Sequence, residues 1–320
     1  MMINVKFPGG AFGRGLRAVL GLVSAGIVSA CVSFPPAPEP TAPVVISANR
    51  LQSVDGALLG LRSWKAEEPT AIILAVHGMN DYGHAFDGPA RWWAEHSDIT
   101  TYAIDQRGHG HSPNFGRWAG APTMKADIRA AVDALKHQHS TTPLFVLGHS
   151  MGAGAVMAGE ADASFGADGL ILAAPGVWGG AALPIPYRVA AELSGVFAPG
   201  KTLTGERAER QSTDNIEILR AMYYDPLVIK DTRIDAVIGV TRLMGEAYRA
   251  PQKINTKALI LIGEKDEIIP LKLQREVSEN FAGDAQVITY PDGWHMIFRD
   301  LQAEKVWRDV AEWTAAQSER

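Results

Sequence analysis

Short apolar runs recur along the chain from residue 71 onward, and stretches with helical periodicity separate them. Residues 71–76 contain no polar side chain, which is typical of a strand buried on both faces of a sheet. Further strands are predicted at 100–104, 143–147, 168–174, 257–263 and 285–290. Helices are predicted between and after them at 88–96, 124–137 and 304–316. Strands that alternate with helices predict an α/β fold, with a mostly parallel sheet covered by helices on both faces.

Two segments depart from this alternation. Residues 44–51 and 58–64 flank Val54-Asp55-Gly56, a turn signal that predicts a hairpin. Between 176 and 255 the apolar residues follow helical spacing instead, at Ile234, Val237, Ile238, Met244 and Tyr248, and more briefly at Ile216, Leu219 and Met222. We interpret 176–255 as a helical cap over the carboxyl ends of the strands, where ligands bind in such sheets. The core then consists of 44–175 and 256–320. The same pattern also fits ordinary core helices, and a cap can have a packed underside of its own.

The N-terminal residues are not expected to belong to the fold. Lys6, Arg14 and Arg17 precede the apolar stretch 18–30, which is too short to span a membrane and has the layout of a secretory signal. That stretch ends in Val-Ser-Ala-Cys and resembles the lipobox of bacterial lipoproteins, in which cleavage leaves a lipidated cysteine at the new N-terminus. We therefore predict a signal peptide at 1–30 and a lipid anchor at Cys31. The alternative is an ordinary signal peptide and a buried cysteine.

Residues 31–43 are expected to form a tether behind this anchor. Five prolines lie between 34 and 43, and they predict an extended, polyproline-like spacer. The chain would then be a lipid-anchored protein of the cell envelope with a membrane as its partner. The lipoprotein resemblance implies the outer membrane, because Val32 rather than an acidic residue follows Cys31.

Composition narrows the functional classes further. The chain has 320 residues, of which 47% are hydrophobic and 20% are charged, as expected of a large globular domain. The net charge is −5 and the basic residues are scattered, so nothing suggests a nucleic-acid partner. Cys31 is the single cysteine, which excludes a disulfide within the chain.

A candidate nucleophile lies at Gly148-His149-Ser150-Met151-Gly152. This pentapeptide follows a predicted strand and precedes a predicted helix, which is the context that gives the G-x-S-x-G pattern its meaning. The two glycines allow a sharp turn that places Ser150 at the end of the sheet. The helix N-terminus there attracts a developing anion. Ser150 is therefore the predicted nucleophile.

A nucleophilic serine needs a base and a group that orients the base. Asp266 and His295 each follow a predicted strand, so both are expected at the same sheet edge as Ser150. Their order along the chain, Ser, Asp and His, is the order found in α/β-hydrolases. Other carboxylates in these loops are interpreted as solvated charges, or as too close to His295 in sequence to orient it without a tight turn: Glu264, Glu267 and Asp292.

The oxyanion of an ester cleavage needs hydrogen-bond donors as well. One donor is expected to be the backbone N–H of Met151, the residue after the nucleophile. The second is expected from the loop after the strand 71–76, where the Met79 N–H is the candidate. Asp105 and the run 107–110 are expected to brace the loops beneath the site.

These motifs together resemble the monoacylglycerol lipase and lysophospholipase branch of the α/β-hydrolase superfamily. The matching stretches cover nearly all of the chain after Val44 and lie at 77–80, 105–112, 148–152, 223–227, 263–266 and 293–295. The resemblance implies the α/β-hydrolase fold, a Ser-His-Asp mechanism, and no metal or organic cofactor. Asp81 matches an acid common in this branch, whereas His84 stands where arginine is frequent. Strict selectivity for glycerol esters is therefore not implied.

The predicted cap would select the substrate. Apolar residues that directly follow the strand 168–174 are expected to line an acyl-chain site: Val177, Trp178, Leu183 and Ile185. The alcohol part would then lie near Asp81 and His84. The predicted function is hydrolysis of monoacylglycerols, lysolipids or similar esters of one acyl chain.

Three alternatives remain at this point. The first is a general carboxylesterase, and the second is a proline-releasing aminopeptidase, for which no acidic cluster is evident in the sequence. The third is a non-catalytic lipoprotein that binds lipid under the cap. It is disfavoured because all three members of the predicted triad are present.

Overall fold

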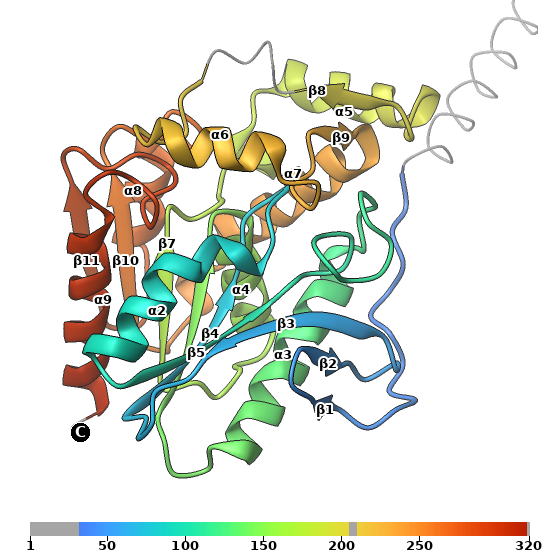
Figure 1. Ribbon diagram of the computed structural model, residues 1–320. Coiled ribbons are helices and arrows are strands. Elements are labelled where there is room, and N and C mark those ends of the chain that lie inside the picture. The colour runs from blue at the N-terminus through green and yellow to red at the C-terminus, as the bar shows by residue number, and fades with distance from the viewer. Residues whose placement is uncertain (1–31, 205–209, 319–320) are drawn as a thin grey trace, which may run out of the picture.

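A nine-stranded sheet forms the centre of the computed structural model, which describes residues 32–204 and 210–318 (Figure 1). The strand order is β1-β2-β3-β5-β4-β6-β7-β10-β11. The leader and Cys31 lie outside the described residues, so their predictions stay untested. No helix in the described ranges combines the length and apolar composition that crossing a bilayer requires.

Six neighbouring strands run parallel, as the sequence predicts. They are β4 (Ala71–Val76), β5 (Ile99–Ile104), β6 (Leu144–His149), β7 (Gly169–Ala173), β10 (Ala258–Gly263) and β11 (Ala285–Tyr290). All residues of β4, β5, β6, β7 and β10 are buried, because helices cover both faces of the sheet. Since parallel strands share a direction, the loops after β4, β6, β10 and β11 meet at one edge.

Two separate apolar layers cover the sheet. One layer joins α3 (Ala121–Gln138), α4 (Met151–Asp162), α7 (Ile234–Arg249) and α8 (Leu271–Glu279) to one face. The other joins α2 (Asp87–His96) and α9 (Ala303–Ser318) to the opposite face, with Trp93 and Val310 fully buried. Figure 1 shows α2 and α9 together in front of the sheet and α3 on the other side. Helix α8 was not among our predicted elements.

The N-terminal part of the fold contains two short strands where a single strand was predicted. Instead of one strand over 44–51, the chain forms β1 (Val45–Ile46) and β2 (Arg50–Gln52), which pair with each other antiparallel. The predicted hairpin joins β2 to β3 (Leu58–Trp64), and Gly56 in its turn has φ +81°, a left-handed conformation that glycine adopts without strain. Strand β3 then pairs antiparallel with β5 and connects the hairpin to the main sheet.

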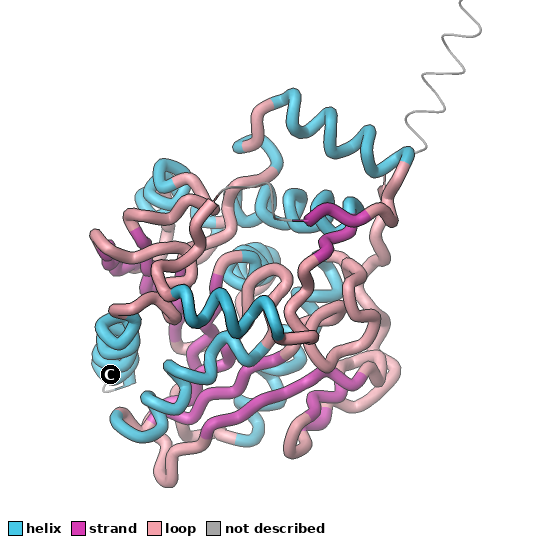
Figure 2. The backbone as a smooth tube through the Cα atoms, turned by 45° about the horizontal axis from the view of Figure 1, so that its top comes forward, coloured by secondary structure: helices cyan, strands magenta, loops and turns pink. Residues whose placement is uncertain are grey.

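The described residues of the segment 176–255, which we call the cap, contain three α-helices. They are α5 (Ile185–Phe197), α6 (Ile216–Tyr224) and α7, and a small sheet of β8 (Thr202–Thr204) and β9 (Asp231–Arg233) accompanies them. The sequence patterns predicted α6 and α7 but neither α5 nor the small sheet. Helix α7 buries Ile238 and Leu243 and packs against α4, whereas α5 is the outermost helix in Figure 2. The cap therefore has a core-like underside and an exposed outer part.

The proline-rich segment, predicted as an extended tether, makes contacts with the folded protein that the sequence did not indicate. It forms no helix or regular strand over 32–44, but it packs along the protein. The Phe34 ring lies edge-on to Trp118, with 6.4 Å between centroids, and the Thr41 and Ala42 N–H groups both donate to the Val54 carbonyl. Proline prevents regular pairing, yet apolar contacts and scattered hydrogen bonds hold the segment in place.

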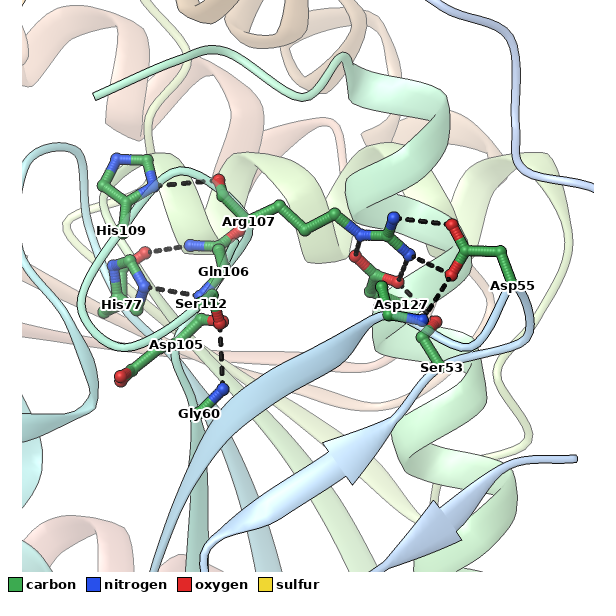
Figure 3. Close-up of polar contacts among 11 residues, drawn as sticks. Ser53, Asp55, Gly60, His77, Asp105, Gln106, Arg107, His109, Ser112 and Asp127 are labelled. Atoms are coloured by element: carbon green, nitrogen blue, oxygen red, sulfur yellow. Dashed lines mark hydrogen bonds and ion pairs between the residues drawn. The ribbon is translucent and has the colours of Figure 1, made fainter. Parts of the chain in front are cut away.

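Charged and polar side chains fix the loops beneath the sheet edge (Figure 3). Arg107 makes two-pronged hydrogen bonds to both Asp55 and Asp127, at 2.7–2.8 Å. Hydrogen bonds and charge from Arg107 outweigh partial burial and lower the pKa of Asp55. Asp105 accepts the Gly83 N–H and the His111 N–H, both at 2.8 Å. These contacts support the predicted bracing role of Asp105 and Arg107.

Two buried histidines complete this network. His77 Nδ1–H donates to the Gly78 carbonyl and Nε2 accepts the Gln106 N–H, at 2.8 and 2.9 Å. His109 packs edge-on to His77, with 5.2 Å between ring centroids, and is 3% exposed. Burial, and then the neighbouring His77, lowers the pKa of His109 to about 3. Both rings are therefore neutral at physiological pH.

The neutral histidines predict a loss of stability in mild acid. The unfolded chain binds a proton at His109 below its ordinary pKa of 6.5 whereas the folded chain does not, so the stability present above pH 6.5 is lost as pH falls. Between pH 7.5 and 5.5 His109 should lower the free energy of unfolding by about 1.4 kcal/mol. Urea unfolding at both pH values tests this. His109→Gln should show a pH dependence smaller by that amount, and an unchanged dependence would contradict the assignment.

Candidate active site

Ser150 occupies a strained turn between β6 and α4. Its backbone has φ +54° and ψ −119°, a conformation rare for residues other than glycine. A Cβ on Gly152 would lie 2.1 Å from the Val76 carbonyl oxygen, and one on Gly148 would lie 2.5 Å from Ala153 backbone atoms. Only glycine fits at these two positions. The turn is therefore fixed by close packing of backbone, and it presents the Ser150 side chain at the sheet edge.

Ser150, His295 and Asp266 form one hydrogen-bonded chain. His295 Nδ1 lies 2.8 Å from Asp266 Oδ2, and His295 Nε2 lies 2.9 Å from Ser150 Oγ. The ionised carboxylate can only accept, so Nδ1 carries the proton and Nε2 accepts from the Ser150 hydroxyl. All three residues are at most 9% exposed. The structure thus brings together the three residues that the sequence placed after three different strands.

Asp266 is held in place by further donors. The N–H groups of Ile268 and Ile269 donate to its Oδ1 at 2.8 and 2.9 Å, and Gln274 Nε2 donates to its Oδ2 at 2.9 Å. Burial alone would raise the pKa of Asp266, but the charge of His295 and these hydrogen bonds lower it below its usual value. Asp266 is therefore a carboxylate that can stabilise a protonated His295. Gln274, on the unpredicted helix α8, was missed by the sequence analysis.

The other acidic residues of these loops point elsewhere. Asp292 pairs with Lys265 at 2.7 Å on the surface, and Glu264 pairs with Arg275 at 3.3 Å. Glu267 accepts the Gln211 N–H. None of these three makes a hydrogen bond to His295 within the described residues.

The loop that carries His295 is fastened on two sides. His149 Nε2–H donates to the His295 carbonyl at 2.8 Å, and burial followed by the nearby His295 lowers the pKa of His149 to about 3. On the other side Asp300 accepts the Trp294 N–H at 2.7 Å and the Thr213 hydroxyl at 2.6 Å. Burial raises the pKa of Asp300 to about 6. Asp300 ties the His295 loop to the cap, and no sequence pattern pointed to it.

The two backbone N–H groups predicted to bind an oxyanion belong to segments next to Ser150. Met151 is the first residue of α4, and Met79 follows Gly78, whose Cβ position would be 3.3 Å from Ser150 Cβ. No hydrogen bond joins the Met79 or Met151 N–H to another residue of the described chain. Both groups are therefore available to a negative oxygen bound next to Ser150.

Asp81 does not present a free carboxylate to a substrate. It is 5% exposed, accepts the Tyr82 N–H, and forms a buried ion pair with Arg299. Burial alone would raise its pKa, but Arg299 lowers the pKa of Asp81 below its usual value. The pair links the loop after β4 to the His295 loop, so Asp81 supports the site rather than lining it. Arg299 was not recognised from the sequence because its partner lies 218 residues away.

His84 lies in a different setting from Asp81. Its Nδ1 is 2.6 Å from Asp87 Oδ2, and this hydrogen bond raises the pKa of His84. His84 and Arg299 line a cavity of about 340 Å³ between α2, α6 and the residues after His295. Of the two predicted head-group contacts, His84 therefore faces an open space.

The four predicted acyl-chain residues do not form one surface. Val177 is fully buried in the core layer that contains α4 and α7, so it cannot line an open mouth. Trp178 is half-buried, with the Arg210 guanidinium 5.2 Å from its ring centroid. Leu183 is half-buried before α5, and Ile185 is 70% exposed at its start. Burial rules out Val177 as a lining residue, whereas a role of Trp178, Leu183 and Ile185 in binding an acyl chain stays a prediction.

The site contains the groups needed for acyl transfer: a nucleophile, a base, an acid that orients the base, and two backbone donors. Among the described residues, no group of three or more His, Cys, Asp or Glu side chains is arranged to hold a metal ion.

The sequence of the chain is similar to those of known proteins. Residues 67–302 match the family described as serine aminopeptidase, S33. A monoacylglycerol lipase from Mycolicibacterium smegmatis is 27% identical over 274 residues, which cover 83% of this chain and 96% of that protein. Human monoglyceride lipase is 23% identical over 277 residues, which cover 84% and 90%.

Solved structures show the same fold. A soluble variant of monoglyceride lipase from Saccharomyces cerevisiae, in complex with a substrate analogue, has a TM-score of 0.71 at 20% identity. The match covers 88% of this chain and 99% of that one. The mostly parallel sheet, the helices on both faces and a family match over most of the chain agree with one another. The chain therefore belongs to the serine aminopeptidase S33 family of α/β-hydrolases.

Proposed function

We propose that this chain is a serine hydrolase that cleaves carboxylic esters of a single acyl chain. The hydrogen-bonded chain from Ser150 through His295 to Asp266 is the observation that carries the proposal. The names of the relatives, monoacylglycerol lipase and monoglyceride lipase, favour an ester of one acyl chain over other acyl compounds.

Acylation of Ser150 would be the first half of the reaction. Ser150 Oγ attacks the carbonyl carbon while its proton moves to His295 Nε2, and Asp266 stabilises the resulting imidazolium. The carbonyl oxygen becomes an oxyanion that accepts from the Met79 and Met151 N–H groups. The bond from carbon to the alcohol oxygen then breaks, and His295 returns the proton to the leaving alcohol.

Deacylation repeats these steps with water. His295 removes a proton from a water molecule, whose oxygen attacks the acyl carbon of the ester on Ser150. A second oxyanion collapses, the bond to Ser150 Oγ breaks, and His295 returns the proton to Ser150. The products are a fatty acid and a regenerated enzyme.

The alcohol part of the substrate would extend from Ser150 toward His84 and the cavity that His84 and Arg299 line, although none of the triad residues lines that cavity itself. A small polar alcohol would find hydrogen-bond partners there at His84 and Asn215 and an apolar wall at Phe298. Asp81, the carboxylate nearest the oxyanion loop, is already neutralised by Arg299 and offers no pairing site for a substrate amine. A peptidase that holds a substrate amine would need a carboxylate free to pair with it.

We also propose that Cys31 carries the lipid anchor. The lipobox-like sequence supports this, and more than one acyl chain is needed for stable attachment. Mass spectrometry of the mature N-terminus should find acyl groups on Cys31, and Cys31→Ser should release the protein from membranes or leave it uncleaved. An unmodified N-terminus at another residue would contradict the proposal.

Asp266→Asn should lower kcat by about four orders of magnitude without unfolding the protein, because His295 loses the partner that fixes its tautomer. Kinetics with p-nitrophenyl butyrate and circular dichroism measure the two effects. Asp292→Asn is the matched control, since it removes a surface carboxylate two residues after β11, in the loop that carries His295, and it should keep activity within twofold. Equal losses in the two variants would contradict the role of Asp266.

Acyl-chain length should control the catalytic efficiency. Each methylene buried in the transition state contributes up to ~0.8 kcal/mol, so kcat/KM should rise by up to about fourfold per methylene between two and eight carbons. A series of p-nitrophenyl esters and monoacylglycerols measures this, with proline p-nitroanilide as the peptidase control. A flat series, or faster release of proline, would refute the proposed substrate class.

A further inference from the structure

The apolar side chains of helix α5 are exposed to solvent, whereas a helix that packs on a protein core buries them. Ile185, Val189, Leu193 and Phe197 are 46–82% exposed, and each follows the previous one by four residues. Four-residue steps keep side chains on one face of a helix, so these four residues form a continuous stripe, which we call the α5 stripe. Gly195 is the single buried residue of α5, and it faces away from the α5 stripe because two residues turn a helix by about 200°.

The cap carries most of the large apolar side chains that are exposed in the described chain. Of the fourteen large apolar side chains that are exposed in the described chain, nine lie between residues 185 and 224. Isolated exposed apolar residues are ordinary on protein surfaces, but a concentration of this kind marks an interaction surface. Tyr187, Tyr223 and Tyr224 belong to this set, and tyrosine suits a boundary between water and an apolar phase.

The N-terminal segment is fastened to the same part of the molecule. We call residues 32–36 the strap. A Cβ on Gly195 would lie 2.7 Å from Val32 Cγ2 and 2.4 Å from Ile238 Cδ1, so the strap and α7 both contact the inner side of α5. Arg242 of α7 donates to the Val32 carbonyl at 2.6 Å, and its guanidinium lies 5.6 Å from the Phe34 ring centroid.

This contact fixes where the preceding chain attaches. Residue 31 is bonded to Val32, and Val32 lies against Gly195 near the C-terminal end of α5, on the face of the helix opposite the α5 stripe. The 31 residues before Val32 include the apolar stretch 18–30 and Cys31, either of which would enter a bilayer. Whichever form the N-terminus takes, it joins the folded protein at the helix that carries the α5 stripe.

We propose that the α5 stripe rests on a phospholipid bilayer, and that the strap orients the cap toward that surface. The α5 stripe enters the boundary between head groups and acyl chains, with the helix lying in the plane of the membrane. Arg188 and Lys201 are exposed cations near the two ends of α5 and would meet anionic head groups. Glu192 pairs with Arg242 at 2.8 Å, so its negative charge is balanced on the protein side.

Depth-dependent fluorescence quenching tests this orientation in the full chain. An environment-sensitive fluorophore is attached at Leu193→Cys, or at Leu58→Cys as the control, since Leu58 is similarly exposed but lies on β3. Wild-type protein treated with the same fluorophore measures the background signal from labelling of the native Cys31. Each protein is reconstituted into vesicles of phosphatidylcholine and phosphatidylglycerol that contain a spin-labelled phosphatidylcholine.

The expected result is a blue-shifted emission at position 193 with quenching at least threefold stronger than at position 58. Equal quenching at the two positions, or a chain that does not associate with the vesicles, would overturn the proposal. Efficient cross-linking between two copies through position 193 would overturn it in favour of a dimer. None of these readouts involves hydrolysis, so their outcome is separable from that of the proposed enzymatic function.

Discussion

The common direction of the parallel strands is the constraint on which the site depends. Because β6, β10 and β11 end at one edge, residues separated by 116 and 29 positions in sequence meet there as Ser150, Asp266 and His295. The strained turn at Ser150 is possible because glycines on either side let α4 approach β4 without a clash. Hydrogen bonds from the Ile268 and Ile269 N–H groups hold Asp266 in place, and a hydrogen bond from His149 holds the His295 backbone.

The parts of the molecule that were predictable are those with local sequence signals. Strands such as β4 and β11 were placed at their observed bounds, because a run of apolar or β-forming residues between turn signals predicts a strand, whether it is fully buried like β4 or largely exposed like β11. The meeting of Ser150, Asp266 and His295 was predictable for the same reason, since each residue type follows a recognisable strand. The family match and the fold of the relatives confirm the α/β-hydrolase architecture that this reasoning predicted.

The parts that were missed depend on long-range contacts. The ion pair of Asp81 with Arg299 and the bonds of Asp300 to Thr213 and Trp294 join residues without any shared local pattern. Helix α5 is different, since its apolar residues do recur at four-residue spacing and this local pattern was overlooked. The tether 31–43 was interpreted only as an extended spacer, because proline content reports the lack of regular structure but not the contact of Phe34 with Trp118. Contacts between distant parts of the chain, rather than local secondary-structure propensity, determine the ion pair, the Asp300 hydrogen bonds and the packing of the proline-rich segment.

Ser150 is the proposed nucleophile of an acyl-enzyme reaction. A fluorophosphonate probe reacts with a serine that an adjacent base activates, and peptide mapping by mass spectrometry locates the adduct. The account predicts one adduct, on the peptide that contains Ser150, appearing in step with the loss of esterase activity. Complete inactivation with the adduct on a different residue, or full activity in a protein labelled stoichiometrically at Ser150, would contradict it.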